Sequence, residues 1–271
     1  FWKDLAQMLY KRLKTNYCKT ILKGITFPFL LIVAWEIAAR LGYLNALFLP
    51  APTKIWYAFV QMVADGSWAE NLLASLQRLA YGFLITVCLA VPLGLAVGKA
   101  KNFQNWVNPT LSFLQQIPPI AWIPIFILAL GIYEAPKIAV IIYAAFFPVF
   151  LNTVQGVKSV DPKLVEVGRA YMLSPLRMIR QVYIPSAYMS IFVGLRLGLS
   201  NCWRALVMAE MITRTTGIGA QIWEGRDLMQ PDRIFVAVFT IGLVGLIIDI
   251  FLKRMECKFM PWKRTNDGKT Q

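Results

Sequence analysis

Apolar runs of near-membrane length, separated by short polar segments, make up most of the chain. A helix needs roughly 20 predominantly apolar residues to cross the hydrocarbon core of a bilayer. The pattern therefore predicts an all-α membrane protein with about six transmembrane helices. We expect the six runs at about 25–41, 75–98, 106–124, 138–151, 186–211 and 234–252.

The longest interior segment with charge on every turn is residues 161–185, between the fourth and fifth runs. Asp161-Pro162 and Ser174-Pro175 both predict helix starts, since Asp or Ser caps free N–H groups and proline fits the first helical position. Pro185 is expected to break or kink the backbone before the next run. Three apolar residues recur at helical spacing in the first helix: Leu164, Val167 and Tyr171. A polar helical hairpin of this kind is suited to being held by another protein.

The third run contains three prolines within Ile117–Pro124, among them Pro118 and Pro119. Prolines break the helical hydrogen-bond ladder, and the freed carbonyls need a protein or water neighbour rather than lipid. This segment is a candidate lining for a pathway across the membrane. A kinked helix that only packs against its neighbours is the alternative.

The fifth run is unusually polar. Ser200 follows Arg196 by one helical turn, and Arg204 follows Ser200 by another. Charged residues inside a membrane usually face a cavity or the interior of the bundle. Two arginines with no carboxylate beside them on this stripe favour an anion, whose oxygens match the guanidinium donors. The candidate pathway residues are Pro118, Pro119, Trp122, Arg196, Ser200, Trp203, Arg204 and Glu210.

Structural roles are the alternatives for several of these residues. Arg204 could pair with Glu210 or with another helix, and Arg196 could lie at a subunit interface. Trp122 and Trp203 could be packing residues. Asp249, deep in the last run, is expected to pair or to reach the membrane surface.

The composition agrees with a membrane protein, because 58% of residues are hydrophobic and only 15% are charged. The chain has no histidine, which excludes His-based catalytic triads, His-ligated metals and histidine proton relays. The four cysteines are far apart, so we interpret them as reduced packing residues rather than as a metal site or disulfides. No metal site and no catalytic residue is predicted, and the N-terminus carries no cleavable signal pattern.

The net charge of +14 is unevenly distributed. Six runs place both ends of the chain on one side of the membrane, and most basic residues fall on that side. The positive-inside rule then makes the hairpin and both termini cytoplasmic. We divide the chain into a basic arm (1–23), a membrane domain (24–252) with the hairpin at 159–185, and a basic tail (253–271). The arm could form an amphipathic helix on the membrane surface; its neighbouring span argues against nucleic acid as a partner.

The residues now show a family resemblance. Glu166-Val167-Gly168 stands where the coupling loop of ABC-importer permeases has Glu-Ala-Ala, and Ile184-Pro185 matches its closing Leu-Pro. Further segments, in the same order, resemble the taurine, alkanesulfonate, nitrate and bicarbonate branch of that family. They are LPAPTKI (49–55), SLQRLAYGF (75–83), PLGLAVG (92–98), IPPIAWIP (117–124), GLRLGL (194–199) and ALVMAEM (205–211).

The resemblance implies a type I ABC importer permease fold with cytoplasmic coupling helices, in a bacterial cytoplasmic (inner) membrane. Two copies would form a translocation pathway for a small anion by alternating access, as a homodimer. Each would dock its hairpin on one of two cytoplasmic ATPase subunits, and an extracytoplasmic binding protein would deliver substrate. ATP and Mg would be held by the ATPase, since this chain has no GxxxxGK[ST] motif and is not itself an enzyme. The coupling residues would be Asp161, Pro162, Leu164, Glu166, Val167, Gly168, Arg169, Tyr171, Met172, Ser174 and Pro175.

The sequence departs from the family pattern at Met172, which stands where a glycine is expected six residues after Glu166. That glycine lets the chain turn between the two short helices, so either the turn differs here or the partner's groove accommodates a methionine side chain. Three other functions are alternatives: a permease of the same family for a thiamine-precursor pyrimidine, an ion-coupled secondary carrier, and an intramembrane enzyme. The last would need a nucleophile and a base paired within the spans.

Overall fold

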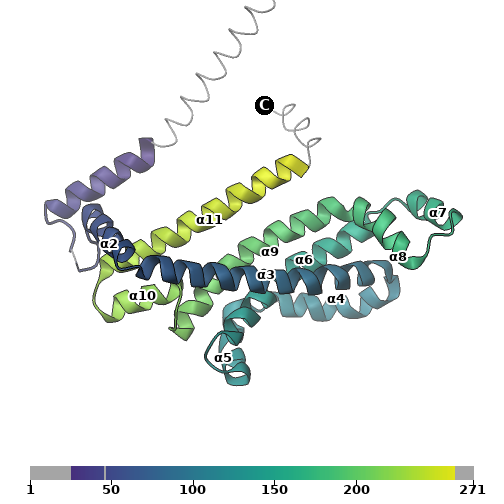
Figure 1. Ribbon diagram of the computed structural model, residues 1–271, viewed down its shortest axis with the longest axis horizontal. Helices are drawn as coiled ribbons and strands as arrows, with labels where there is room; N and C mark the ends of the chain where they lie inside the picture. The colour runs from purple at the N-terminus through teal and green to yellow at the C-terminus, as the bar shows by residue number, and fades with distance from the viewer. Residues whose placement is uncertain (1–25, 46, 260–271) are drawn as a thin grey trace, which may run out of the picture.

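The computed structural model describes residues 26–45 and 47–259, and these form helices joined by short turns, without a strand among them (Figure 1). The basic arm and most of the basic tail therefore lie outside the described residues. The first helix covers residues 26–40. The others are α2 (Pro52–Ala64), α3 (Ser67–Lys99), α4 (Lys101–Gln116), α5 (Pro119–Leu130), α6 (Ala135–Lys158), α7 (Pro162–Ala170), α8 (Pro175–Met178), the π-helix η1 (Ile179–Tyr183), α9 (Ile184–Thr213), α10 (Ile218–Asp227) and α11 (Pro231–Phe259).

Within the described residues, four helical segments are long and apolar enough to cross a membrane: Ser67–Lys99, Ala135–Lys158, Pro175–Asp227 and Pro231–Glu256. The pair Pro109–Gln116 and Pro119–Leu130 makes a fifth if it is counted as one span, bent by 93°. An all-α membrane fold is thus confirmed. The sixth span stays a prediction, at the helix of residues 26–40.

The centre of the molecule is a bundle of α3, α6 and α9 (Figure 1). Glycines let these helices approach closely. A Cβ atom at Gly94 of α3 would lie 2.7 Å from Thr153 Cβ of α6, and one at Gly156 of α6 would lie 2.8 Å from Ser190 Cβ of α9. Small residues at helix contacts are typical of membrane bundles, where close packing replaces the hydrophobic driving force.

The break between α4 and α5 follows the prolines of the third run. Ile117 and Pro118 have extended backbone angles, and α5 begins at Pro119. The Tyr143 hydroxyl of α6 lies 2.5 Å from the carbonyl oxygen of Leu114, to which it donates, and 3.4 Å from that of Ile117. The freed carbonyls therefore find a protein neighbour, as expected for non-helical backbone at membrane depth.

The hairpin of α7, α8 and η1 projects from one end of the bundle, and α2 and α10 lie at the other end (Figure 1). Pro185 does not break the chain as one of the two expectations had it, because α9 continues from η1 without an interruption. A proline leaves the carbonyl one turn earlier without its helical partner. The five-residue π turn that directly precedes α9 takes up this mismatch.

Candidate functional site

Both caps predicted for the hairpin are present. The Asp161 carboxylate accepts a hydrogen bond from the Lys163 amide at 2.8 Å, and the Ser174 hydroxyl oxygen accepts one from the Arg177 amide at 3.5 Å. Pro162 and Pro175 each occupy the first turn of the helix that follows. These local contacts define where each short helix begins.

Gly168 holds the two arms of the hairpin together. A Cβ atom at Gly168 would lie 2.7 Å from Met178 Sδ and 3.3 Å from Val182 Cγ2, so the backbone of α7 packs directly on α8 and η1. Beside this contact lies a cavity of about 410 Å³ between α7 and η1, lined by Leu164, Tyr171 and Val182 among others. The hairpin is a packed unit with an open groove rather than a loose loop.

Met172 makes the turn at the end of α7 in the left-handed region, with φ at 48°. The Leu173 amide donates to the Gly168 carbonyl at 3.1 Å and the Met172 amide donates to that of Arg169 at 2.9 Å. These two bonds form a Schellman motif with Met172 at the position that glycine usually occupies. The turn therefore has the form that glycine favours, and the methionine side chain extends into solvent, 92% exposed.

Replacing this residue by glycine, Met172→Gly, is expected to stabilise the hairpin locally, because a non-glycine residue in the left-handed region costs roughly 1–2 kcal/mol. Amide hydrogen exchange of residues 162–174 in the purified chain should slow several-fold. Met229 offers a matched site: it has φ at 54° after α10, and Met229→Gly should slow exchange around α10 alone. Unchanged or faster exchange of the hairpin in Met172→Gly would contradict this account.

The hairpin exposes an apolar surface although it lies outside the bundle. Five of its large apolar side chains are between 49% and 92% exposed: Leu164, Val167, Tyr171, Met172 and Leu176. Glu166 and Arg169 are exposed on the same helix, and Glu166 has no ion pair among the described residues. A contiguous apolar patch rimmed by charge is typical of a protein–protein contact.

Arg204 lies on an exposed stripe of α9, in the last third of the polar fifth run. Its Nε donates to the Ser200 carbonyl at 3.2 Å and its Nη2 donates to the Asn201 amide oxygen at 2.8 Å. Leu197, two turns before Arg204, and Met208, one turn after it, are 48% and 37% exposed. No carboxylate in the described part of the chain pairs with Arg204, so its charge faces outward uncompensated.

Helix α5, which follows the proline break, borders this stripe. Ile123 of α5 packs against Ala205 and Ala209, which flank the stripe on α9. Trp122 stacks on Phe126 with ring centroids 5.9 Å apart and contacts Tyr143. The proline segment and the polar stripe thus border one open face of the molecule.

Arg196 has different neighbours from Arg204. Its guanidinium forms ion pairs with two carboxylates of α11, Glu256 at 2.5 Å and Asp249 at 3.1 Å. The pairing expected for Asp249 is therefore confirmed. Trp203 is buried, and its Nε1 donates to the Ile241 carbonyl of α11 at 3.1 Å. Both residues fasten α9 to α11 in this structure.

Glu210 does not pair with Arg204. It is fully buried and accepts hydrogen bonds from Ser75 Oγ at 2.7 Å, Arg78 Nη1 at 2.8 Å and the Gly219 amide at 3.1 Å. Arg78 also donates to the Thr216 carbonyl at 2.8 Å. Glu210 thus belongs to a buried polar cluster between α3, α9 and the segment before α10, at the end of the bundle opposite the hairpin.

The cluster extends to the start of α6. Arg78 binds Glu134, which also pairs with the fully buried Lys137 at 3.0 Å. The Arg78 guanidinium holds the pKa of Glu134 below its usual value. Gly217, with φ at 121°, passes so close to the Glu210 carboxylate that a side chain there would overlap it. Sequence reasoning did not select Arg78 or Lys137; their signal was a charge within or beside an apolar run.

The described residues contain no group of three or more Cys, Asp or Glu side chains placed to hold a metal ion. Cys88 and Cys202 are free thiols, one exposed and one buried.

Comparisons with known proteins agree with this arrangement. The family model described as "Binding-protein-dependent transport system inner membrane component" matches residues 90–259. A putative aliphatic sulfonates transport permease of Bacillus subtilis (strain 168) is 33% identical over 91% of this chain and 90% of its own length. A nitrate import permease of Synechocystis sp. is 30% identical over 90% of this chain and 91% of its own, and a taurine permease of Escherichia coli (strain K12) is 27% identical over 86% of both.

The fold also has a solved counterpart. A chain of the inward-facing MetNI methionine ABC transporter superposes with a TM-score of 0.54 at 15% identity, over 73% of this chain and 97% of that one. At this identity the likeness concerns the fold, and it matches the type I permease fold expected from the motifs. The family match and the sulfonate and nitrate relatives together show that this chain belongs to the inner membrane components of binding-protein-dependent ABC import systems.

Proposed function

We propose that this chain forms, with a second copy of itself, the translocation pathway of an ATP-driven importer for a small anion of the sulfonate, nitrate or bicarbonate type. The observation that carries the proposal is Arg204, a cation without a carboxylate partner among the described residues, on an exposed polar stripe of a spanning helix. The sulfonate, taurine and nitrate relatives support an anionic substrate.

The cost of charge in a membrane supports a covered, hydrated stripe. An arginine that faces lipid costs up to roughly 2.5–3.5 kcal/mol on insertion scales, with the highest cost at the bilayer centre. Arg204 lies toward the outer end of its span, still within the apolar run, and should face a cavity instead. A second copy that packs against the open face bordered by α5 and α9 would enclose the stripe. An isologous pair of this kind would bring two Arg204 side chains to one axis.

The hairpin is proposed as the element that couples this pathway to an ATPase. Its caps and its Gly168 contact favour a rigid unit, and its exposed apolar patch suits a groove on a partner. ATP binding and hydrolysis would occur on two such partners, and motion would reach the membrane through the hairpin. Alternating access to Arg204 would follow from that motion.

The orientation follows from the positions of the basic residues. Lys99 and Lys158 stand in the last turns of α3 and α6, and these two helices end at the hairpin end of the molecule (Figure 1). The positive-inside rule supports a cytoplasmic hairpin and cytoplasmic termini in the inner membrane. A binding protein would then deliver the anion at the opposite end, where α2 and α10 lie.

Arg204→Gln tests the proposal. The variant loses a charge-assisted contact of about 1.5–3 kcal/mol, so uptake at subsaturating substrate should fall by roughly 10- to 100-fold. Uptake of taurine, an alkanesulfonate, nitrate and bicarbonate would be measured in proteoliposomes that contain the ATPase and the cognate binding protein. The control is Arg254→Gln, which removes an exposed charge of α11 away from the stripe.

Three outcomes would count against the proposal. Uptake by Arg204→Gln within about twofold of the unaltered chain would make Arg204 a structural residue. Gradient-driven uptake by the chain alone, indifferent to ATP, would indicate a secondary carrier. Uptake of a neutral pyrimidine in place of any anion would support the other solute class of this family.

A further inference from the structure

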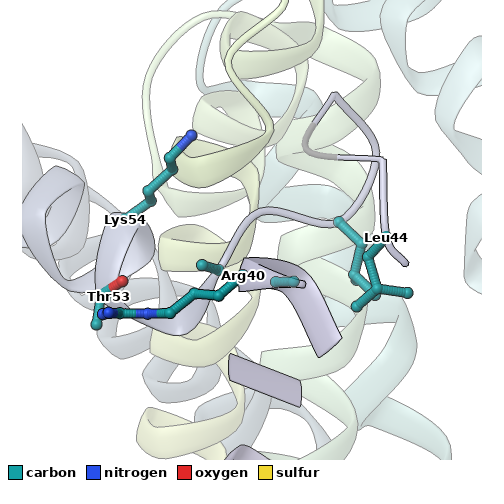
Figure 2. A pocket seen from close by; sticks show the side chains of 7 residues that line it. Arg40, Leu44, Thr53 and Lys54 are labelled. Carbon is teal, nitrogen blue, oxygen red and sulfur yellow. The ribbon is translucent and has the colours of Figure 1, made fainter. Parts of the chain in front are cut away.

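A cleft of about 300 Å³ lies between the end of the helix of residues 26–40 and the start of α2 (Figure 2). Arg40 extends from the first helix toward Thr53, and Lys54 extends from the next position of α2. Leu44 lies on the far side of the opening. The cleft is at the end of the molecule opposite the hairpin and is separate from the Arg204 stripe.

The charged side chains at the cleft have a net positive charge. Glu36 binds Arg40 Nε at 2.6 Å and also accepts from the Thr53 amide at 3.1 Å and the Thr53 hydroxyl at 3.0 Å. Lys54 has no ion pair among the described residues, and the Arg40 side chain is 68% exposed. Arg40 and Lys54 against Glu36 leave a net charge of about +1, which matches the single negative charge of a phosphodiester.

A separate apolar groove of about 390 Å³ begins at the same turn of α2, on another face of the helix. Pro52 lines this groove while its neighbours Thr53 and Lys54 line the cleft. The groove runs between α2 and α11, with Ile55 and Phe59 on one side and Phe239 on the other. The cationic cleft and the apolar groove therefore lie on neighbouring faces of the first turn of α2.

Aromatic residues place this point at the membrane boundary. Tyr43, Trp56 and Tyr57 surround the first turn of α2 and are 81%, 66% and 65% exposed. Tyr and Trp are enriched at the level of the lipid headgroups. A ligand here would have its polar part in the interface and its apolar part in the bilayer.

We propose that this cleft and groove form a binding site for an anionic phospholipid. The phosphate would lie in the cleft that Arg40 and Lys54 line, and an acyl chain would follow the groove between α2 and α11. A free anion would leave the apolar groove uncovered, whereas a phospholipid carries both features in one molecule. Because Glu36 already joins Arg40 to Thr53, the bound lipid would also fasten the helix of residues 26–40 to α2.

Native mass spectrometry of the purified full-length chain tests the site. The chain would be equilibrated with phosphatidylglycerol and phosphatidylcholine of identical acyl chains, and the lipid that remains bound would be counted. Each cation near a lipid surface contributes about fivefold in affinity, so the preference for phosphatidylglycerol should lie between about 5- and 25-fold. Arg40→Gln/Lys54→Gln should reduce it to within about twofold of parity.

The control removes two exposed charges elsewhere, as Lys158→Gln/Arg254→Gln, and should keep the preference. Equal losses in both double variants would overturn the site in favour of a general charge effect. Lys54→Gln alone leaves the Glu36–Thr53 contact intact and should lower the preference for phosphatidylglycerol about fivefold. This single variant tests the site even if the double variant fails to fold. No loss in Lys54→Gln would overturn the proposal.

Two further experiments test the acyl-chain groove and distinguish a phospholipid from a free phosphate. Phe239→Ser/Leu243→Ser should weaken retention of both lipids alike and leave the preference unchanged, because these residues line the groove. An unchanged retention would overturn the acyl-chain part. An excess of glycerol phosphate should not displace the lipid; displacement would indicate a site for a free phosphate instead.

Discussion

Arg78→Met is expected to destabilise the chain by about 3–5 kcal/mol, the usual cost of breaking a buried ion pair from one side. Glu210 is fully buried, and the side chain of Arg78 is 7% exposed. Removing the guanidinium leaves the Glu210 charge with only Ser75 and a backbone amide as donors. It also frees the Thr216 carbonyl, which holds the segment before α10 in place.

The double variant Arg78→Met/Glu210→Met shows whether the instability comes from the unpaired Glu210 charge or from lost side-chain packing. Both charges leave together, so the double variant should be more stable than Arg78→Met alone. The apparent melting temperature of the purified chain in one detergent is the measurement. Lys253→Met is the control: its pair with Asp249 is exposed and should contribute less than about 1 kcal/mol. A double variant as unstable as the sum of the two single variants would show that the charges are not coupled.

Leu164→Asp/Tyr171→Asp should abolish association with the ATPase while leaving the membrane bundle folded. The two side chains are 49% and 78% exposed and line the groove of the hairpin. Central apolar residues of an interface contribute about 2 kcal/mol or more each, so the two changes should weaken binding by at least about 100-fold. Glu166→Lys, a charge reversal on the same helix, should weaken it in the same direction.

Co-purification of the ATPase with the tagged chain, followed by an ATPase assay, measures this effect. Tyr133→Asp/Leu228→Asp is the matched control, since it places the same charges on exposed apolar residues at the other end of the molecule. The control should retain the ATPase. Undiminished ATPase on the hairpin variant would show that the two subunits meet elsewhere.

Local signals in the sequence were sufficient for the hairpin. Asp161-Pro162 and Ser174-Pro175 begin helices because a cap needs only residues two or three positions away. The departure at Met172 was visible as well, and the structure adds that a Schellman turn holds it in the left-handed region. The break at Ile117 and Pro118 was also predictable, because proline acts on its own turn.

Long-range partners could not be read in the same way. Arg196 and Arg204 were placed on one stripe, yet eight residues of an α-helix turn about 80° beyond two full turns. That rotation lets Arg196 reach Asp249 and Glu256 on α11 while Arg204 remains on the open face. Which face α11 covers depends on packing between distant helices.

The sequence by itself therefore determined the membrane class, four of the spans and the capped hairpin, because hydrophobic length and helix capping act over a few turns. Only the tertiary structure showed that Glu210 pairs with Arg78, 132 residues away, and that Arg196 pairs with carboxylates of α11. It also brought Arg40 of the first helix and Lys54 of α2 to one cleft, beside a separate apolar groove. The partner of a buried charge depends on which side chains the packed helices bring close to it in space. The sequence pattern alone does not give the distances between side chains on different helices.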